Sequence, residues 1–268
     1  MTYTLITGAS GGIGLALARQ LAAQKHNLLL VARNAQKLAQ LSQHLQAQYG
    51  VQVAFIAADL TQPEAAQHIY RQTQQHHWEV DLLVNNAGVG SGGEFATLEL
   101  PLELALLQLN MASLVALTHL FLQPMRERRR GTIINIASMT AFMPVPYMAT
   151  YAASKAFVRS FTEALTQECQ PYGIYVLLFA PGLTRTNFNE AAGINNEKAV
   201  GLQSDYKTAT AQTPEEVAEE LVNALQAKKP LHIAGRRNRF GARLLALLPN
   251  GLIARYVARS YQEKLAQN

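Results

Sequence analysis

The chain has 268 residues, of which 49% are hydrophobic and 15% are charged, a balance that supports a substantial buried core and argues against a disordered or coiled-coil protein. Its single cysteine, Cys169, rules out an intrachain disulfide framework and a cysteine-clustered zinc site. The net charge of +5 is modest for this length and points to no particular class of partner.

The sequence carries no recognisable targeting signal. The N-terminus lacks the basic and apolar regions of a signal peptide, and no uninterrupted apolar run approaches the ~18 residues of a membrane span. The single cysteine fits a reducing compartment. We therefore expect a cytoplasmic protein.

Short apolar runs alternate with helical patterns through most of the chain. The strand-like runs are residues 3–7, 27–32, 51–57, 81–85, 132–137, 174–180 and 231–234. The helical patterns are residues 13–24, 35–48, 63–76, 100–126 and 152–170. Because the strand-like runs are almost continuously hydrophobic, we expect strands that are covered on both faces. The alternation predicts an α/β fold, a Rossmann-like doubly wound parallel sheet of about seven strands with helices on both faces, in one domain over residues 1–235.

A glycine-rich turn follows the first expected strand and opens the first helix, in Thr7-Gly-Ala-Ser-Gly-Gly-Ile-Gly14. The Gly-x-x-x-Gly-x-Gly spacing permits a tight turn and lets the backbone approach a pyrophosphate closely. The N-terminus of the helix then offers N–H groups and a partial positive charge to the phosphates. We therefore predict a dinucleotide site here. Its expected contacts are Gly8, Ser10, Gly11, Gly12, Ile13 and Gly14.

The end of the second strand indicates which dinucleotide binds. An NAD-selective site places a carboxylate there, which accepts a hydrogen bond from the ribose 2′-OH. This chain has Ala32 at that position and Arg33 next, and a guanidinium there could pair with a 2′-phosphate and stack on adenine. We therefore predict NADP(H) rather than NAD(H). Asp59 and Leu60, after the third strand, are expected beside the adenine, although Asp59 could equally be a turn or capping residue.

Tyr151 and Lys155 lie at the start of the helical pattern that follows the fifth strand. Their i, i+4 spacing places both side chains on one face of a helix. An ammonium beside a phenol lowers the pKa of the phenol, which makes the hydroxyl a usable proton donor and acceptor. The same spacing is common in ordinary surface pairs, so its meaning depends on the other motifs.

Together, the glycine turn, Asn85-Asn-Ala-Gly88 after the fourth strand, and Ser138 ahead of Tyr151-x-x-x-Lys155 have a known counterpart. In these motifs the chain resembles the short-chain dehydrogenase/reductase family. The matching motifs run from Thr7 to about Thr186, and the rhythm of strands and helices extends the match to about Ala234.

The resemblance implies a catalytic tetrad of Asn110, Ser138, Tyr151 and Lys155. Tyr151 would pass its proton to a carbonyl oxygen as hydride reaches the carbon, or take the alcohol proton in the other direction. Lys155 would lower the pKa of Tyr151 and hydrogen-bond the nicotinamide ribose. Ser138 would orient the substrate oxygen, and Asn110 would hold a water that relays protons to Lys155.

The resemblance also implies further cofactor contacts and a quaternary structure. The expected contacts are Asn86, Ala87, Gly88, Tyr151, Lys155, Pro181, Gly182, Thr184 and Thr186. In the family, the helices at residues 100–126 and 152–170 pack against another subunit, so a homodimer or homotetramer is expected.

Two segments depart from the regular rhythm. Residues 184–210 have little periodicity and are expected to form a mobile substrate lid. Residues 236–268 are rich in Leu and Arg and are divided by Pro249-Asn-Gly251, which predicts two helices packed on the same domain or at an interface. This basic, amphipathic tail could cover the substrate cleft, form an oligomer contact or lie on a membrane surface, and the membrane role is the less favoured.

The motifs together predict an NADP(H)-dependent oxidoreductase that interconverts a carbonyl and a secondary alcohol. Residues 142–148 and Phe188 should line an apolar cleft for a small or medium substrate. The alternatives are a non-catalytic NADP-binding regulator and a membrane-surface lipid or steroid type of reductase. We expect no metal at His76-His77 and no nucleic acid at the basic helix end Arg126–Arg130, which complements a helix dipole.

Overall fold

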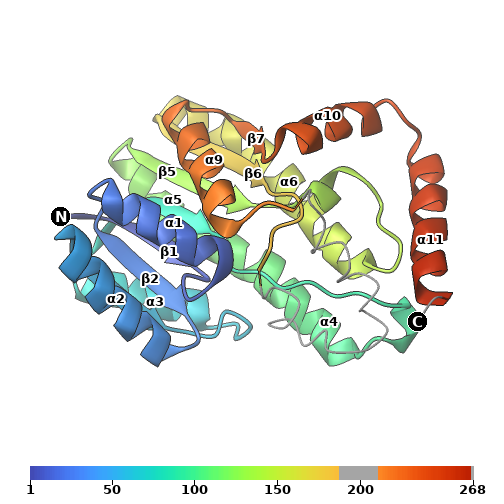
Figure 1. Cartoon of the computed structure of the whole chain (residues 1–268). Coiled ribbons are helices and arrows are strands. Elements are labelled where there is room, and N and C mark those ends of the chain that lie inside the picture. The colour runs from blue at the N-terminus through green and yellow to red at the C-terminus, as the bar shows by residue number, and fades with distance from the viewer. Residues whose placement is uncertain (187–210, 267–268) are drawn as a thin grey trace.

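The computed structural model of the chain describes residues 1–186 and 211–266, and Figure 1 shows a central sheet with helices packed around it. The sheet has seven strands in the order β3-β2-β1-β4-β5-β6-β7. All of its strand pairs are parallel. The strands are β1 (Thr2–Thr7), β2 (Leu28–Ala32), β3 (Val53–Ala57), β4 (Glu79–Asn85), β5 (Gly131–Ile136), β6 (Ile174–Ala180) and β7 (Leu231–Ile233). The doubly wound fold expected from the sequence is confirmed.

Helices cover both faces of the sheet. One face carries α1 (Gly12–Ala23), α2 (Ala35–Tyr49) and α9 (Pro214–Gln226). The other carries α3 (Ala65–Gln75), α5 (Ser113–Glu127) and α6 (Ala149–Cys169). Every residue of β2 is buried, because its successive side chains enter the two cores in turn.

The single helix expected at residues 100–126 is divided in the structure. It consists of α4 (Leu100–Leu107), a π-helical turn η2 (Gln108–Ala112) and α5. Among the described residues, Leu100–Glu127 is the stretch whose length and mean hydropathy of 1.6 would suffice for a membrane span. Packing explains the second half of this composition, because Leu117, Phe121 and Met125 are buried in the core against the sheet.

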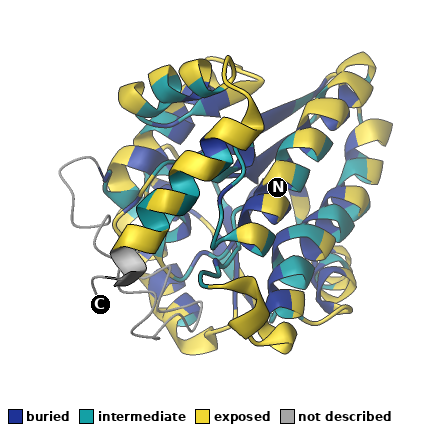
Figure 2. Cartoon of the chain, turned by 90° about the vertical axis from the view of Figure 1, so that its right-hand side faces the viewer, coloured by how far each residue is buried: buried dark blue, intermediate teal, exposed yellow. Residues whose placement is uncertain are grey.

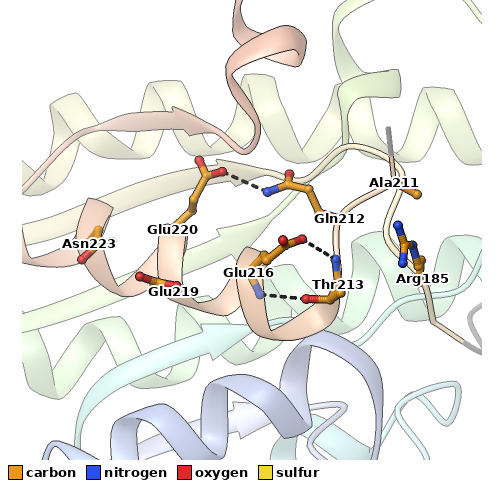
Figure 3. Close-up of a pocket in the computed structure, with 8 residues that line it drawn as sticks. All are labelled: Arg185, Ala211, Gln212, Thr213, Glu216, Glu219, Glu220 and Asn223. Atoms are coloured by element: carbon orange, nitrogen blue, oxygen red, sulfur yellow. Dashed lines mark hydrogen bonds between the residues drawn. The ribbon is translucent and has the colours of Figure 1, made fainter. Parts of the chain in front are cut away.

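Helix α9 was missed by the sequence reading, although its start is marked clearly. Thr213 accepts a hydrogen bond from the backbone N–H of Glu216, and the Glu216 carboxylate accepts one from the N–H of Thr213 (Figure 3). This reciprocal capping box, with Pro214 in the first turn, is readable from the sequence Thr-Pro-Glu-Glu. Val217 and Leu221 then bury the inner face of the helix.

Two helices, α10 (Arg236–Leu245) and α11 (Asn250–Ala266), follow β7 and extend away from the sheet (Figure 1). The predicted break at Pro249 is therefore confirmed. The beginning of this extension is fixed by Glu220 of α9, whose carboxylate accepts hydrogen bonds from His232, Arg239 and the backbone N–H of Gly235.

Three shorter helices complete the described chain: η1 (Phe95–Thr97), η3 (Met139–Phe142) and η4 (Gln170–Tyr172). Most predicted boundaries differ from the observed ones by one or two residues. The largest difference among the helix starts concerns α6, which was expected from residue 152 and begins at Ala149. Of the expected lid, Thr184, Arg185 and Thr186 are described, whereas residues 187–210, including Phe188, lie outside the described part of the chain.

Candidate active site

The predicted site residues gather at the carboxyl ends of the central strands. The glycine turn follows β1, and residues 85–88 lie at the end of β4. Ser138 follows β5, and Pro181 follows β6. The strand order reverses between β1 and β4, which carry connections in opposite directions along the sheet. In doubly wound sheets this switch point forms the ligand-binding crevice.

The glycine turn brings backbone groups unusually close together. Gly8 has a φ of +68°, in the region that favours glycine. A Cβ on Gly14 would lie 2.4 Å from the main-chain oxygen of Gly8, so a side chain there would collide with backbone. No described side chain caps the start of α1, and its first turn contains no acidic residue. The N–H groups of this turn therefore suit an anionic pyrophosphate, and the observed geometry fits a dinucleotide.

The loop after β4 is fastened to the glycine turn by Thr7. Thr7 Oγ1 accepts hydrogen bonds from the backbone N–H groups of Asn86 (3.0 Å) and Ala87 (2.9 Å). In return, Asn86 Nδ2 donates to the main-chain oxygen of Thr7 at 2.8 Å. Asn85 is directed into the sheet instead, where it donates to Thr118 and Asn135. Asn85 is thus a structural residue, and Asn86 and Ala87 border the crevice.

Arg33, predicted to select the cofactor, and Asp59, predicted beside the adenine, lie at the ends of neighbouring strands. Arg33 is exposed directly after β2, next to Asn34, which caps α2. Asp59 follows β3, and its Oδ1 accepts hydrogen bonds from the N–H (3.0 Å) and hydroxyl (2.9 Å) of Thr61. Asp59 therefore forms the turn that the sequence left open as an alternative, while buried Leu60 packs into the core.

Tyr151 and Lys155 lie in the first two turns of α6, on one side of the helix. Both are almost fully buried, with 8% and 4% of their surfaces exposed. Lys155 Nζ donates a 3.0 Å hydrogen bond to the main-chain oxygen of Ile136 and lies 5.9 Å from the centroid of the Tyr151 ring. Burial lowers the pKa of Lys155 to about 8, so the ammonium form still predominates at neutral pH.

Asn110 occupies the π-helical turn between α4 and α5. Its Nδ2 donates to the main-chain oxygen of Val89 and to Ser154 Oγ, and its Oδ1 accepts from the N–H of Val89. A Cβ placed on Gly88 would lie 3.1 Å from Asn110 Oδ1 and 3.3 Å from Lys155 Nζ. Gly88 therefore lies between the two polar groups, and its missing side chain leaves room beside both.

Ser138 is the residue that turns the chain from β5 into η3. Its Oγ accepts a 3.2 Å hydrogen bond from the N–H of Thr140, which leaves the hydroxyl hydrogen available for another acceptor. The next residue, Met139, donates its N–H to the main-chain oxygen of Pro181 at 2.9 Å. This bond joins the serine loop to the loop that follows β6.

The loop after β6 connects the glycine turn with the C-terminal extension. A Cβ on Gly12 would lie 3.2 Å from the methyl carbon of Thr186, so Thr186 lies beside the glycine turn. A Cβ on Gly182 would lie 2.1 Å from Asn238 Nδ2, so the first turn of α10 presses against this loop. Thr184 is buried and pairs with Gln212 through a β-bridge.

The sequence did not predict that Gln212, Glu220 and Asn238 contribute to this region, because no local motif surrounds them. Glu220 also accepts a hydrogen bond from Gln212 at 2.9 Å (Figure 3). One carboxylate therefore joins the segment before α9 to the segment after β7. Burial would raise the pKa of Glu220, but hydrogen bonds from His232, Arg239, Gly235 and Gln212 together lower it to about 2.

A cavity of about 530 Å³ lies beside these residues and is drawn in Figure 3. It is lined by Arg185, Ala211, Gln212, Thr213, Glu216, Glu219, Glu220 and Asn223. Three carboxylates make this wall acidic, whereas the crevice beside α1 presents backbone N–H groups.

Comparison with known proteins places the chain among similar sequences. Residues 2–197 match the sequence profile of the short chain dehydrogenases. The chain is 30% identical over 267 residues to dehydrogenase/reductase SDR family member 7B of Xenopus tropicalis, with 97% of this chain and 86% of the relative covered.

Solved structures share the fold. A short-chain dehydrogenase from Sphingobium yanoikuyae in complex with NADPH has 29% identity and a TM-score of 0.81, with 94% and 95% of the two chains covered. A short chain dehydrogenase/reductase from Burkholderia phymatum in complex with NAD has a TM-score of 0.82, with 91% and 92% covered. Its 23% identity supports the fold alone.

Proposed function

The chain belongs to the short-chain dehydrogenase/reductase family of oxidoreductases that act on CH–OH groups, and we propose that it interconverts a carbonyl and a secondary alcohol with NADP(H), using Tyr151 as the general acid and base. When bound, the dinucleotide would supply a hydride to the carbonyl carbon, or accept one from the alcohol. The remaining steps fall to side chains of the chain itself.

The proton step is assigned to three of these side chains. In reduction, Tyr151 gives its phenolic proton to the carbonyl oxygen as the carbon gains hydride, which balances the charge that develops on oxygen. The Lys155 ammonium stabilises the resulting phenolate, because it is buried beside the ring at 5.9 Å from the centroid. Ser138 donates its hydroxyl hydrogen to the same oxygen and orients it.

Proton resupply to the buried Lys155 is assigned to the side of Asn110. The space beside Gly88 is bordered by Asn110 Oδ1 and Lys155 Nζ, and a water there would have an acceptor and a donor within reach. The backbone of Val89 holds the Asn110 amide in place through two hydrogen bonds. Asn110 therefore acts as a positioning residue for the proton path.

The observation that carries the proposal is the buried Lys155 ammonium on the same helical face as Tyr151. A purely structural helix gains nothing from a buried cation that, in the described part of the chain, donates to one carbonyl oxygen, since burial of a charge is costly. A non-catalytic NADP-binding regulator would need neither this lysine nor the oriented hydroxyl of Ser138.

The test is oxidation of NADPH against a panel of ketones and aldehydes, followed by its absorbance. Tyr151→Phe should lower kcat by at least about 100-fold while NADPH still binds. Tyr175→Phe is the matched control, because Tyr175 lies at the amino end of β6 and its hydroxyl donates to the main-chain oxygen of Lys229. Activity that survives Tyr151→Phe would overturn the mechanism, and NADPH binding without turnover of any carbonyl in wild type would favour the regulator.

NADP(H) preference is proposed on the basis of Arg33. No carboxylate ends β2, since Ala32 occupies its last position, and Arg33 is exposed beside it. The similar short-chain dehydrogenase from Sphingobium yanoikuyae, solved in complex with NADPH, supports this proposal. Arg33→Ala should reduce kcat/KM for NADPH at least about tenfold and leave NADH almost unchanged, whereas Arg71→Ala should change neither. A wild type without preference for NADPH contradicts the proposal.

An apolar substrate is proposed from the segment that joins η3 to α6. Val145 is buried, and Tyr147 has a φ of +65° and faces Tyr261 of α11, with ring centroids 6.0 Å apart. Tyr261 also donates to the Met148 sulfur, so the extension borders this segment. Kinetics over ketones of increasing chain length would test this, and a preference for charged or highly polar substrates would contradict it.

A homo-oligomer is proposed through α4. This short helix exposes Leu100, Leu102 and Leu104, with Phe95 nearby, a grouping that favours a partner surface. Light scattering on wild type and on Leu100→Ser/Leu104→Ser should show a loss of oligomer mass, and a monomeric wild type would contradict the proposal.

A further inference from the structure

The outer face of the C-terminal extension carries large apolar side chains in water. In α10 and the turn after it, Phe240, Leu244 and Leu247 are exposed, Leu247 to 80%. In α11, Leu252 and Tyr256 are exposed, Tyr256 to 77%. Figure 2 shows α11 along the outside of the molecule with much of its surface exposed. Single exposed apolar residues are ordinary, but a row of them on two consecutive helices marks an interaction surface.

Arginines share this face with the apolar side chains. Leu252, Arg255, Tyr256 and Arg259 follow the spacing i, i+3, i+4, i+7, which places them on one side of α11. Arg236, Phe240, Arg243 and Leu244 follow the spacing i, i+4, i+7, i+8, which also places them on one side of α10. We call these eight residues, with Leu247, the tail face. All nine are exposed.

The charge of this region is entirely of one sign. From Arg236 to Gln262 the sequence contains six arginines and no acidic residue. Only Arg239 of the six is paired within the described structure, with Glu220 of α9 at 2.7 Å. The other five, Arg236, Arg237, Arg243, Arg255 and Arg259, are exposed. The tail face therefore presents uncompensated positive charge to a partner.

The opposite side of the extension is fixed to the protein. Ala242 of α10 and Ile253 of α11 are buried, and Arg239 is held by Glu220 and by the main-chain oxygen of Ile233. Tyr261 packs near Tyr147. The extension therefore packs on the protein through its inner side, and the tail face is a separate, outward surface.

We propose that the tail face docks on a lipid bilayer that contains anionic headgroups. The leucine and aromatic tips would enter the boundary between headgroups and acyl chains, and the long arginine side chains would keep their guanidinium groups at phosphate level. Each basic residue near an anionic leaflet adds to the attraction, which weakens with salt. This proposal is independent of the reaction that the Tyr151 site performs.

Two other partners fit the same face less well. A second copy docked symmetrically on it would bring four exposed arginines against four, and such like charges repel. A nucleic acid would satisfy the arginines but would leave Leu244, Leu247 and Leu252 without a function, because a phosphate backbone offers no apolar surface. An anionic bilayer satisfies both the cations and the apolar tips.

Flotation of the full chain with vesicles tests the proposal. The vesicles are phosphatidylcholine alone, or phosphatidylcholine and phosphatidylglycerol in a ratio of about two to one, at low and at physiological salt. Arg243→Gln/Arg255→Gln removes charge from the tail face, and Lys37→Gln/Arg71→Gln removes the same charge from exposed positions elsewhere. Leu247→Ser/Leu252→Ser removes apolar tips, with Phe55→Ser as its control at an exposed apolar residue of β3.

The wild type should float with the anionic vesicles and less with phosphatidylcholine alone. Each tail-face variant should lower the partition coefficient by about tenfold or more, whereas both controls float like wild type. Unchanged melting temperatures would show that the variants are folded. The proposal is overturned if the wild type does not float, if either tail-face variant floats like wild type, or if the tail-face variants instead abolish an oligomer. Loss confined to the arginine variant, together with DNA binding by wild type, would indicate a nucleic acid.

Discussion

Lys155 Nζ donates a hydrogen bond of 3.0 Å to the main-chain oxygen of Ile136, the last residue of β5. This bond holds the second turn of α6 against the carboxyl end of β5. The glycine turn lies at the same end of the sheet, after β1. An ammonium has three hydrogens to donate, so two remain directed elsewhere, toward the side on which Gly88 and Asn110 lie. The position of the Lys155 ammonium is thus set by strand β5, and not by the helix alone.

Replacement of Lys155 by Met should stabilise the cofactor-free protein while it abolishes turnover. The pKa of Lys155 falls from 10.5 to about 8 on folding, so the unfolded chain binds more protons between these values. The free energy of unfolding of the wild type should therefore rise as the pH rises from about 8 to about 10.5, and the cost of the buried charge is fully present below pH 8. At pH 7 the variant should be more stable by up to about 3 kcal/mol.

Urea unfolding of both proteins at pH 7 and pH 10 measures this difference, since titration of the tyrosines is common to both. Lys37→Met, at an exposed lysine, is the control and should change neither the stability nor its dependence on pH. A wild type and a Lys155→Met variant with parallel pH profiles would contradict the expected burial of the ammonium.

Glu220→Gln should weaken the protein at neutral pH and flatten its acid transition. Glu220 has its pKa lowered to about 2, so the wild type gains stability above its unfolded pKa near 4.5 and loses it as the pH falls toward 2. Because a quarter of the side chain is exposed, we expect about 1–2 kcal/mol at pH 7. Chemical unfolding between pH 3 and 7 is the measurement. Exposed Glu219→Gln is the neighbouring control. Equal slopes for Glu220→Gln and wild type would rule out the network as a source of acid sensitivity.

Gly14→Ala should prevent close packing of the glycine turn. The new Cβ would lie 2.4 Å from the main-chain oxygen of Gly8, and backbone on both sides cannot move aside cheaply. We expect a loss of about 2–3 kcal/mol of stability and loss of NADPH binding. Gly11→Ala tests the same turn without a collision, because its backbone is extended, with a φ of −169°, and no atom lies within 4 Å of its Cβ position. Thermal unfolding should separate the two variants, and equal melting temperatures would refute the steric account.

These contrasts explain which parts of the molecule the sequence could predict. The glycine turn and the Tyr151–Lys155 spacing are local patterns on regular elements, so the fold and the meeting of these residues at one edge followed from them. The π-helical turn at Asn110 could not be predicted, because residues 100–126 form one continuous helical pattern in the sequence. Glu220 gave no local signal either, since its partners Gln212, His232 and Arg239 are 8 to 19 residues away in sequence. Helix α9 did have a signal in Thr213 and Glu216 that was not used.

The contact between Gly182 and Asn238 makes a prediction that couples the extension to the site. Gly182→Ala would place a Cβ 2.1 Å from Asn238 Nδ2, so either the loop after β6 or the first turn of α10 must shift. Because this loop continues to Thr186 beside the glycine turn, we expect KM for NADPH to rise at least about tenfold.

Asn238→Ala removes the colliding amide and supplies the matched rescue. Alone it loses one hydrogen bond to the main-chain oxygen of Ala234, so it should cost about 1 kcal/mol of stability and leave KM almost unchanged. In the double variant Gly182→Ala/Asn238→Ala the space is restored, and KM for NADPH should return to within about threefold of wild type. Steady-state kinetics on the four proteins give the coupling directly. Additive effects of the two substitutions would mean that Gly182 serves the cofactor without help from α10, because only a shared steric contact makes one change compensate for the other.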